Sequence, residues 1–296
     1  MQEQDNTFSA DLSRRGVLMG AAAGGLVIAG GGAMLAPSAN AATAKIKKGG
    51  VLRIGVSGGG PTETQDAHLG GFTADTARQY QLYDRLVTRD SNFKLVLELA
   101  DTFTPNKTGN IWTIRVKKGV KFHNGDEVTA EDVAFSFGSE RMFGASAPRQ
   151  ANQDSKTIAV DIGRKTTNST PGSMEVPPPE ITAIARNLWP SLQSIEIVDR
   201  YTVRLINAVP DLTLEGRIAR LGSEIVSKRA YMASKDWASW AQAPVSAGPF
   251  KVKEMKMDQY LVLSAHDDYF GGKPLVKEIR YMVVPEVSSR INGLLS

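Results

Sequence analysis

The sequence predicts a mixed α/β fold, of the α+β or α/β class, because strand and helix patterns follow one another without internal repeats. Residues 51–57 carry apolar side chains at every second position, which is typical of a strand. Residues 73–87 carry apolar side chains at helical spacing. The stretch 195–206 contains two strand patterns around Asp199 and Arg200, which predicts a hairpin.

The remaining elements follow from the same reasoning. Residues 111–116 alternate between apolar and polar side chains, which predicts a strand. Thr129 stands three residues before Asp132, and this capping-box pattern predicts a helix that runs to about Phe137. Residues 144–180 are rich in Ser, Thr, Asn, Gly and Pro, and we expect a long loop there. Further expected elements are a helix at 212–228 and strands at 250–255, 260–264 and 279–284.

Residues 1–41 have the layout of a twin-arginine export signal. Arg14 and Arg15 precede a mildly apolar stretch, 20–36, and a small-residue site ends at Ala41. We expect cleavage after Ala41 and a periplasmic mature protein. An uncleaved membrane anchor is the alternative, but the stretch is rich in glycine and shorter than the ~20 apolar residues of a spanning helix. No cysteine is available at the cleavage site for a lipid anchor.

Composition excludes several classes of function. The chain contains no cysteine, so thiol nucleophiles, zinc thiolate sites and disulfides are ruled out. The formal net charge is only +4, and the densest basic group is the short run from Lys45 to Lys48. Nucleic-acid binding usually needs a concentrated basic patch with motif support, and we expect no nucleic-acid partner. Residues 42–296 are long enough for one large or two ordinary domains.

Six motifs occur in order along the chain, at 99–101, 112–125, 129–137, 195–203, 247–250 and 268–274. Together they resemble the signature of peptide- and nickel-type (family 5) extracellular solute-binding proteins, which serve ABC importers. One motif departs from the family pattern, since Ala247-Gly248-Pro249-Phe250 replaces the usual Thr-Gly-Pro-Tyr. Family members also have a third lobe that this chain lacks, so the resemblance identifies an N-terminal portion only. Their acidic anchor for a peptide's amino group lies in that lobe and has no counterpart here.

The resemblance implies a periplasmic binding protein-like architecture of two lobes with a discontinuous first domain. Residues 42–78 and 188–285 would form lobe I, and 79–187 would form a small inserted domain. Residues 286–296 would begin a further, truncated lobe. Ligand would lie in a cleft and be trapped by hinge closure.

Candidate ligand contacts lie after the first strand. The family resemblance places this loop in the cleft, and glycines let main-chain groups approach an extended peptide closely. We therefore expect Ser57, Gly58, Gly59 and Gly60 to contact ligand, although an ordinary glycine-rich turn explains them equally well. Tyr269 is a further expected contact, because the resemblance places its segment near the cleft.

Other aromatic residues have a structural explanation. Trp189, Trp237 and Trp240 could present flat apolar faces to a ligand, but we expect them mainly in core or interdomain packing, and Phe122 and Phe137 in the core.

Catalytic and metal sites receive little support from the sequence. Residues 55–59 match G-x-S-x-G, but a nucleophile elbow requires a helix directly after the serine, and Gly60 and Pro61 follow instead. His68, His123 and His266 show no metal-ligand spacing. His123 belongs to a turn, and we expect His266 on a solvated loop. We expect no catalytic residue, metal or cofactor.

The expected function is therefore non-enzymatic capture of di- or oligopeptides for an ABC importer. The protein would act as a monomer with membrane permease and ATPase subunits as partners. Within the same class, the cargo could instead be a nickel chelate, an opine or an oligosaccharide. Two different classes also remain open, namely an exported serine hydrolase that uses Ser57 and a periplasmic chaperone-like or sensory module.

Overall fold

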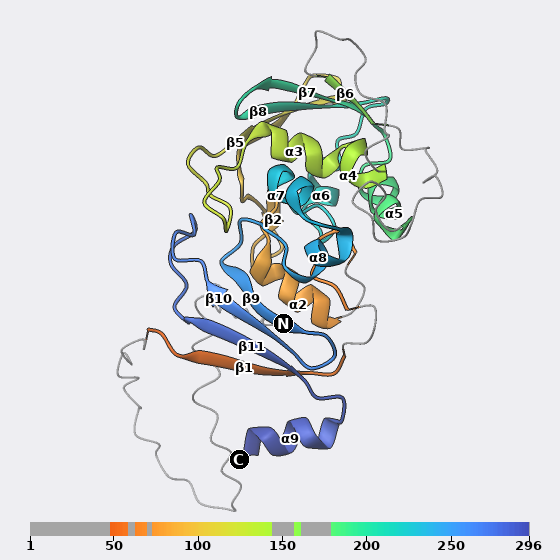
Figure 1. Ribbon diagram of the computed structural model, residues 1–296. Helices are drawn as coiled ribbons and strands as arrows, with labels where there is room; N and C mark the ends of the chain where they lie inside the picture. The colour runs from red at the N-terminus through yellow and green to blue at the C-terminus, as the bar shows by residue number, and fades with distance from the viewer. Residues whose placement is uncertain (1–47, 59–62, 70–72, 144–156, 161–178, 296) are drawn as a thin grey trace, which may run out of the picture.

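The computed structural model describes residues 48–58, 63–69, 73–143, 157–160 and 179–295. The expected signal at 1–41 and most of the expected loop at 144–180 lie outside these residues. The described chain contains two main sheets, with helices between them and beside them (Figure 1). The mixed α/β class predicted from the sequence is confirmed.

The first sheet joins segments that are far apart in the sequence. Its strands are β1 (Val51–Val56), β9 (Phe250–Lys256), β10 (Tyr260–Ala265) and β11 (Glu278–Val283). Their order is β1-β11-β10-β9, and β1 runs parallel to β11 while the other pairs are antiparallel. Because the first strand completes a sheet built from the end of the chain, the first domain is discontinuous, as expected.

The second sheet has five strands in the order β4-β5-β8-β7-β6, namely β4 (Ala100–Pro105), β5 (Ile111–Val116), β8 (Thr202–Asn207), β7 (Leu192–Asp199) and β6 (Thr157–Ala159). The predicted hairpin is the pair β7–β8, and β8 pairs with β5 from Ile111 to Arg115. Residues 192–207 thus share a sheet with 100–116 and not with 250–283. The domain boundary expected at 187/188 does not separate the two sheets.

Short elements fill the space around the two sheets. A two-stranded sheet consists of β2 (Val87–Arg89) and β3 (Leu95–Leu97). The helices are α2 (Thr73–Leu82), α3 (Ala130–Phe137), α4 (Ser139–Phe143), α5 (Pro179–Leu188), α6 (Leu214–Ile218), α7 (Lys228–Ala233), α8 (Trp237–Gln242) and α9 (Val287–Leu295). In Figure 1, α6, α7 and α8 lie between the five-stranded sheet above and the four-stranded sheet below. The capping box predicted for α3 is present between Thr129 and Asp132.

The helix expected at 212–228 was wrong, since only α6 and the first residue of α7 are helical in this range. Gly222 has φ of +94°, a left-handed conformation that ends helical geometry. Glu224 and Val226 then pair through isolated bridges with Arg85 and Ser246, residues distant in sequence. Long-range main-chain pairing therefore replaces the local helix.

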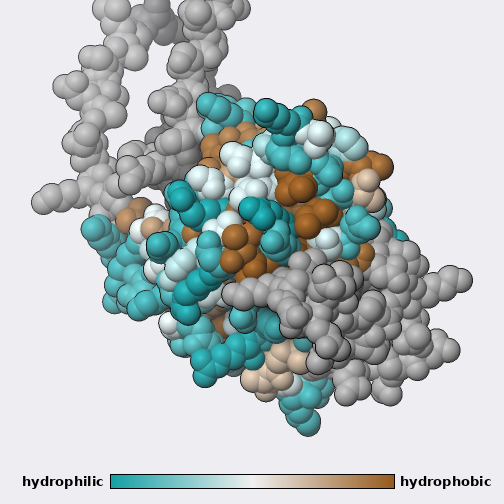
Figure 2. All heavy atoms as spheres, turned by 90° about the horizontal axis from the view of Figure 1, so that it is seen from above, coloured by the Kyte–Doolittle hydropathy of each residue, from teal (hydrophilic) through white to brown (hydrophobic). Residues whose placement is uncertain are grey.

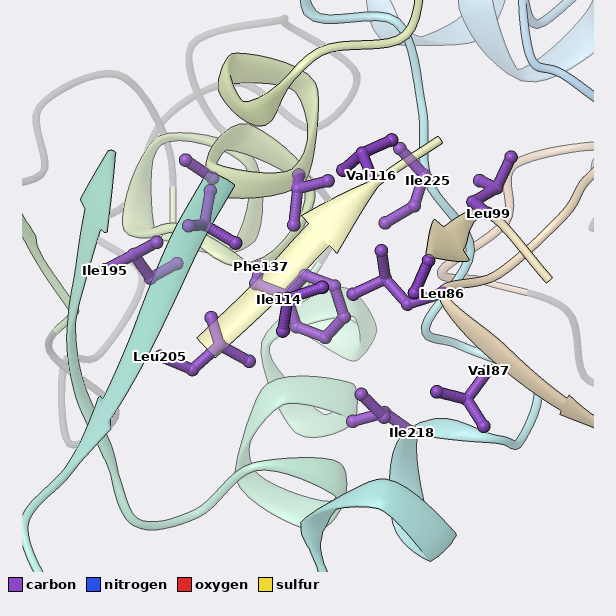
Figure 3. Close-up of a cluster of buried hydrophobic side chains, with 14 of the residues drawn as sticks. Leu86, Val87, Leu99, Ile114, Val116, Phe137, Ile195, Leu205, Ile218 and Ile225 are labelled. Carbon is purple, nitrogen blue, oxygen red and sulfur yellow. The ribbon is translucent and has the colours of Figure 1, made fainter. Parts of the chain in front are cut away.

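The hydrophobic core has two parts. The larger cluster packs the five-stranded sheet against α3, α5 and α6, with Ile114 and Leu205 at its centre (Figure 3). The smaller cluster packs the four-stranded sheet against α2 and α8. Phe122 and Phe137 are both 1% exposed, which confirms their expected core positions. Seen from above, the outer surface shows hydrophobic residues in small groups among hydrophilic ones (Figure 2).

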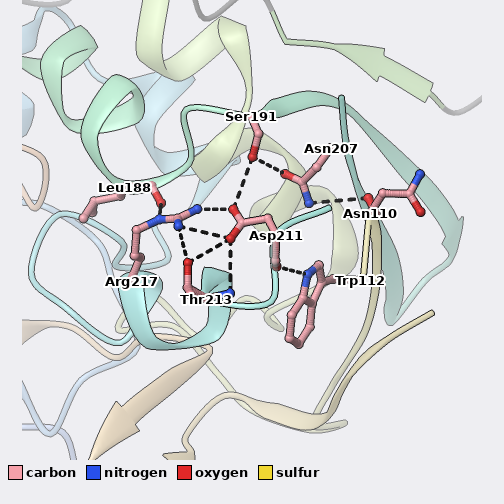
Figure 4. Close-up of polar contacts among 8 residues, drawn as sticks. All are labelled: Asn110, Trp112, Leu188, Ser191, Asn207, Asp211, Thr213 and Arg217. Carbon is pink, nitrogen blue, oxygen red and sulfur yellow. Dashed lines mark hydrogen bonds and ion pairs between the residues drawn. The ribbon is translucent and has the colours of Figure 1, made fainter. Parts of the chain in front are cut away.

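A polar network secures the connection between β8 and α6 (Figure 4). The Asp211 carboxylate forms an ion pair with Arg217 and also accepts hydrogen bonds from Thr213 and Ser191. The indole Nε1 of Trp112 donates to the main-chain oxygen of Asp211 at 2.9 Å. The network ties the end of the five-stranded sheet to the helix that follows it.

Candidate ligand-binding site

Ser57 and Gly58 follow directly after β1, as expected. Ser57 is exposed and Gly58 is half-buried, whereas Gly59 and Gly60 lie outside the described residues. A Cβ atom added to Gly58 would meet nothing within 4 Å, so a ligand can approach its main chain. β1 is also one of the two edge strands of its sheet among the described residues, which leaves main-chain groups available next to this loop.

Tyr269 lies at the opposite end of the same sheet. Val51, at the start of β1, pairs with Glu278. The main-chain nitrogen of Ala265 donates to the main-chain oxygen of Lys277, the residue before Glu278. Tyr269 follows Ala265 by four residues, whereas Ser57 follows the other end of β1. The six residues of β1 span five steps of ~3.3 Å, so the two ends of this strand lie about 17 Å apart. Ser57 and Tyr269 therefore do not converge on one dipeptide-sized site.

Tyr269 has contacts of its own within the fold. Its hydroxyl donates to Asp84 Oδ1 at 3.1 Å, and its ring packs against Phe270 with centroids 4.9 Å apart. Both rings line a cavity of about 480 Å³ together with β2, β3 and Lys117. These contacts position the segment after β10 against the small β2–β3 sheet.

A buried polar segment, 63–68, begins at the Ser57 end of the sheet. The Glu63 carboxylate accepts the main-chain N–H of Asp258 at 3.0 Å, in the turn between β9 and β10. The next residue in that turn, Gln259, accepts the N–H of Val283, which pairs with Val56 immediately before Ser57. Glu63 also forms an ion pair with Arg78 of α2. Sequence patterns gave no indication that this segment is buried, because it is polar and has no regular secondary structure.

Asp66 is the centre of this segment. Its Oδ1 accepts hydrogen bonds from Arg141 on α4 and from the main-chain N–H of His68. Its Oδ2 accepts the indole N–H of Trp237, on α8, at 2.9 Å. Asp66 and Arg141 have fully buried side chains. Burial alone would lower the pKa of Arg141, but the Asp66 carboxylate together with Tyr231 and Tyr83 outweighs it and raises the pKa. Asp66 thus joins three elements that lie up to 171 positions apart in sequence.

Two of the three histidines are buried. His266 was expected on a solvated loop, but it is only 6% exposed and packs edge to face against His123. His68 is buried as well. Within the described ranges, no group of three or more His, Asp or Glu side chains could hold a metal ion.

The geometry also gives no support to a Ser57 nucleophile. His123 and His266 both direct a ring nitrogen at Gly248, and the buried His68 ring interacts with the main chain of Glu224. A general base must lie within hydrogen-bond reach of its nucleophile, and no histidine bonds to Ser57. Among the described helices, the first after Ser57 begins at Thr73 and not directly after the serine, as an elbow requires.

None of the described helices is both long and apolar enough to cross a membrane.

Comparisons with known proteins agree with this fold. The chain is 28% identical over 257 residues to the oligopeptide-binding protein AppA of Bacillus subtilis, which covers 87% of this chain and 41% of the relative. The structure of AppA in complex with a nonapeptide superposes with a TM-score of 0.63 over 84% of this chain and 43% of AppA, at 25% identity. The dipeptide-binding protein of Escherichia coli is 25% identical over 74% of this chain and 39% of its own length.

A further structure shares the fold alone. The binding protein MoaA of A. tumefaciens R10, in complex with mannopinic acid, has a TM-score of 0.65 at 23% identity and covers 83% of this chain and 43% of MoaA. The chain therefore spans less than half the length of the relatives that it matches. The family model "Bacterial extracellular solute-binding proteins, family 5 Middle" matches residues 94–296. The chain belongs to the family 5 bacterial extracellular solute-binding proteins.

Proposed function

We propose that this chain is part of a periplasmic binding protein that captures di- or oligopeptides for an ABC importer and leaves them chemically unchanged. The observation that carries the proposal is the match to AppA along most of the chain, in sequence and in fold. The twin-arginine layout of residues 1–41 supports export. A membrane permease and an ATPase would be its partners, and the protein would act as a monomer.

The proposed cargo site is the loop after β1. An extended peptide would be held through main-chain hydrogen bonds to Ser57, Gly58, Gly59 and Gly60, which recognise any sequence of side chains. Tyr269, at the far end of the sheet, would contact only a ligand long enough to span β1. For a short peptide, its role would be to position the segment after β10 through Asp84.

Cargo capture can be tested on the intact exported protein with a pool of di- to pentapeptides and native mass spectrometry. We expect retained peptide in the folded protein. A nickel–histidine chelate, an opine and an oligosaccharide in parallel samples test the three non-peptide cargos. Retention of one of these, with no retained peptide, would replace the peptide assignment.

A matched pair of glycine variants tests the loop. Gly58→Ala and Gly293→Ala both add a methyl group with no neighbour within 4 Å, so both should leave the fold intact. We expect Gly58→Ala to weaken peptide binding about tenfold, a loss of about 1.4 kcal/mol, because the methyl group obstructs main-chain contact. Gly293→Ala should bind normally. Equal binding by both variants would remove the loop from the site.

Two further measurements test for a serine hydrolase and for an uncleaved membrane anchor. A fluorophosphonate probe should leave Ser57 unlabelled, and a Ser57 adduct that is lost in Ser57→Ala would favour the hydrolase.

N-terminal sequencing of the periplasmic protein should begin at Ala42. A mature protein that retains residues 1–41 would favour the uncleaved anchor.

A further inference from the structure

Trp237 differs from the other tryptophans of this chain. The sequence contains four, and all four lie in the described residues. Trp112, Trp189 and Trp240 are at most 3% exposed, in the hydrophobic core. Trp237, the first residue of α8, is only half-buried, so part of its ring faces solvent.

Its partly exposed ring is nevertheless held in a fixed orientation. The indole N–H donates to Asp66, and Asp66 is itself fixed by Arg141 and by the N–H of His68. Both charged partners are completely buried. Support of a partly exposed side chain by buried, oriented groups is typical of a binding residue.

Trp237 is connected to the end of β1 through the buried segment 63–68. Asp66, which holds it, is three residues from Glu63, and Glu63 bonds to the β9–β10 turn beside the end of β1. In Figure 1, α8 and the start of α2 lie on the side of the molecule where β1 ends. Tyr269 is at the other end of this sheet.

We propose that Trp237 is a cargo-contacting residue that selects peptides carrying an apolar or aromatic side chain. This inference rests on the proposed function and deepens it. The main-chain contacts after β1 hold the peptide without regard to its sequence, and the solvent-facing part of the indole packs against one side chain. Asp66 and Arg141 are positioning residues, which fix the plane of the ring without touching cargo.

Tryptophan fluorescence can follow this contact directly. Because the other three indoles are buried, quenching by acrylamide reports mainly on Trp237. Two equimolar tripeptide pools serve as probes. In one, each peptide has one Phe and two Ala, and in the other, one Ser replaces the Phe. We expect the Phe pool to bind at least tenfold more tightly and to reduce quenching.

Three variants separate contact from positioning. Trp237→Ala should lose the preference for the Phe pool, and Trp237→Phe should keep most of it. Asp66→Asn should retain the indole but increase its quenching and weaken the preference, because the ring loses a charged acceptor. Tyr80→Ala is the control, since it removes another exposed aromatic ring, 46% exposed on α2, and should bind like the wild type.

The outcomes distinguish this inference from the proposed function. If the wild type binds both pools and folded Trp237→Ala keeps the same Phe-to-Ser ratio, the inference is overturned and peptide capture stands. If the folded wild type retains neither pool, the peptide assignment itself fails, and the selectivity inferred for Trp237 fails with it.

Discussion

His123 and His266 direct ring nitrogens at the same acceptor, the main-chain oxygen of Gly248. The distances are 3.1 Å from His123 Nε2 and 3.2 Å from His266 Nδ1, and the two rings meet edge to face with centroids 5.1 Å apart. His123 follows β5 of the five-stranded sheet, and His266 follows β10 of the four-stranded sheet. The pair therefore lies where the two sheets approach each other.

The half-buried His123 ring should make stability fall in acid. Burial lowers its pKa to about 3; the bond to Gly248 opposes this shift, and His266 and Lys251 add to it. The folded pKa lies below the unfolded value of about 6.5, so acidification protonates the unfolded state first. Stability is unaffected above pH ~6.5, and the loss reaches about 2 kcal/mol at pH 5.

Urea unfolding of His123→Gln and the wild type between pH 5 and 8 checks this prediction. Glutamine keeps an N–H donor for Gly248 but does not titrate. The variant should lose less stability as the pH falls. If the free energy of unfolding fell equally with pH in the two proteins, His123 would not contribute to acid sensitivity.

Asp211→Asn should destabilise the protein by about 2 kcal/mol, because it leaves Arg217 without its buried counter-charge. Burial alone would raise the pKa of Asp211, but hydrogen bonds from Arg217 and Thr213 outweigh it and lower the pKa. The stability from this carboxylate is therefore present at neutral pH and is lost as the pH falls through its lowered pKa.

Asp101→Asn is the control for this change, measured by the same denaturant titration at pH 7. Asp101 also pairs with an arginine, Arg115, but both side chains are about half exposed. Such a surface pair contributes ~0–1 kcal/mol. Equal losses in the two variants would contradict the role given to burial.

Phe93→Asn should stabilise the protein by about 0.5–1 kcal/mol. Phe93 has φ of +60° at the tip of the β2–β3 hairpin, and its ring is 78% exposed. Left-handed geometry is unfavourable for a bulky side chain and is tolerated by asparagine. Alanine lacks the short polar side chain that forms local hydrogen bonds in this geometry, so Phe93→Ala should show little gain. Thermal unfolding of the wild type and the two variants measures their stability. An alanine variant as stable as the asparagine variant would refute the strain argument.

Gly248→Ala should prevent stable folding or reduce stability by more than ~3 kcal/mol. A Cβ atom at this position would collide with the main chain of Leu82 and Tyr83, which cannot rotate away as a side chain could. The nitrogen of Gly248 also bonds to the Leu82 oxygen at 3.0 Å. Circular dichroism and denaturant unfolding test this. A variant with wild-type stability would mean that the segment around Gly248 can move away from Leu82 and Tyr83 at no cost.

Local patterns predicted the strands at 51–57 and 111–116 and the hairpin that became β7–β8. They succeeded because alternation and turn residues act over a few positions. The helix predicted to reach 87 ends at Leu82, whose oxygen bonds to Gly248. No short-range sequence pattern predicts that Gly248, which is distant in sequence, bonds to this residue. Four strands, β2, β3, β4 and β6, were not predicted; β2, β3 and β6 have three residues each, which carry too little pattern to detect.

Part of the candidate site could likewise be predicted from the sequence, and part could not. Glycines after β1 were visible in the sequence as a place for main-chain contact. The sequence did not reveal that Ser57 and Tyr269 lie at opposite ends of one sheet, because strand register fixes that separation. Nor did it reveal that Asp66 holds Trp237, a contact across 171 positions.

The sequence by itself determined the α/β class, the family motifs and most strands of the two large sheets, because these depend on residue type and short spacing. Tertiary structure alone decided that β7 and β8 join β5, that His266 is buried and that Asp66 connects α4 to α8. Burial and ion pairing between distant segments depend on how the whole chain packs, and no local pattern encodes them.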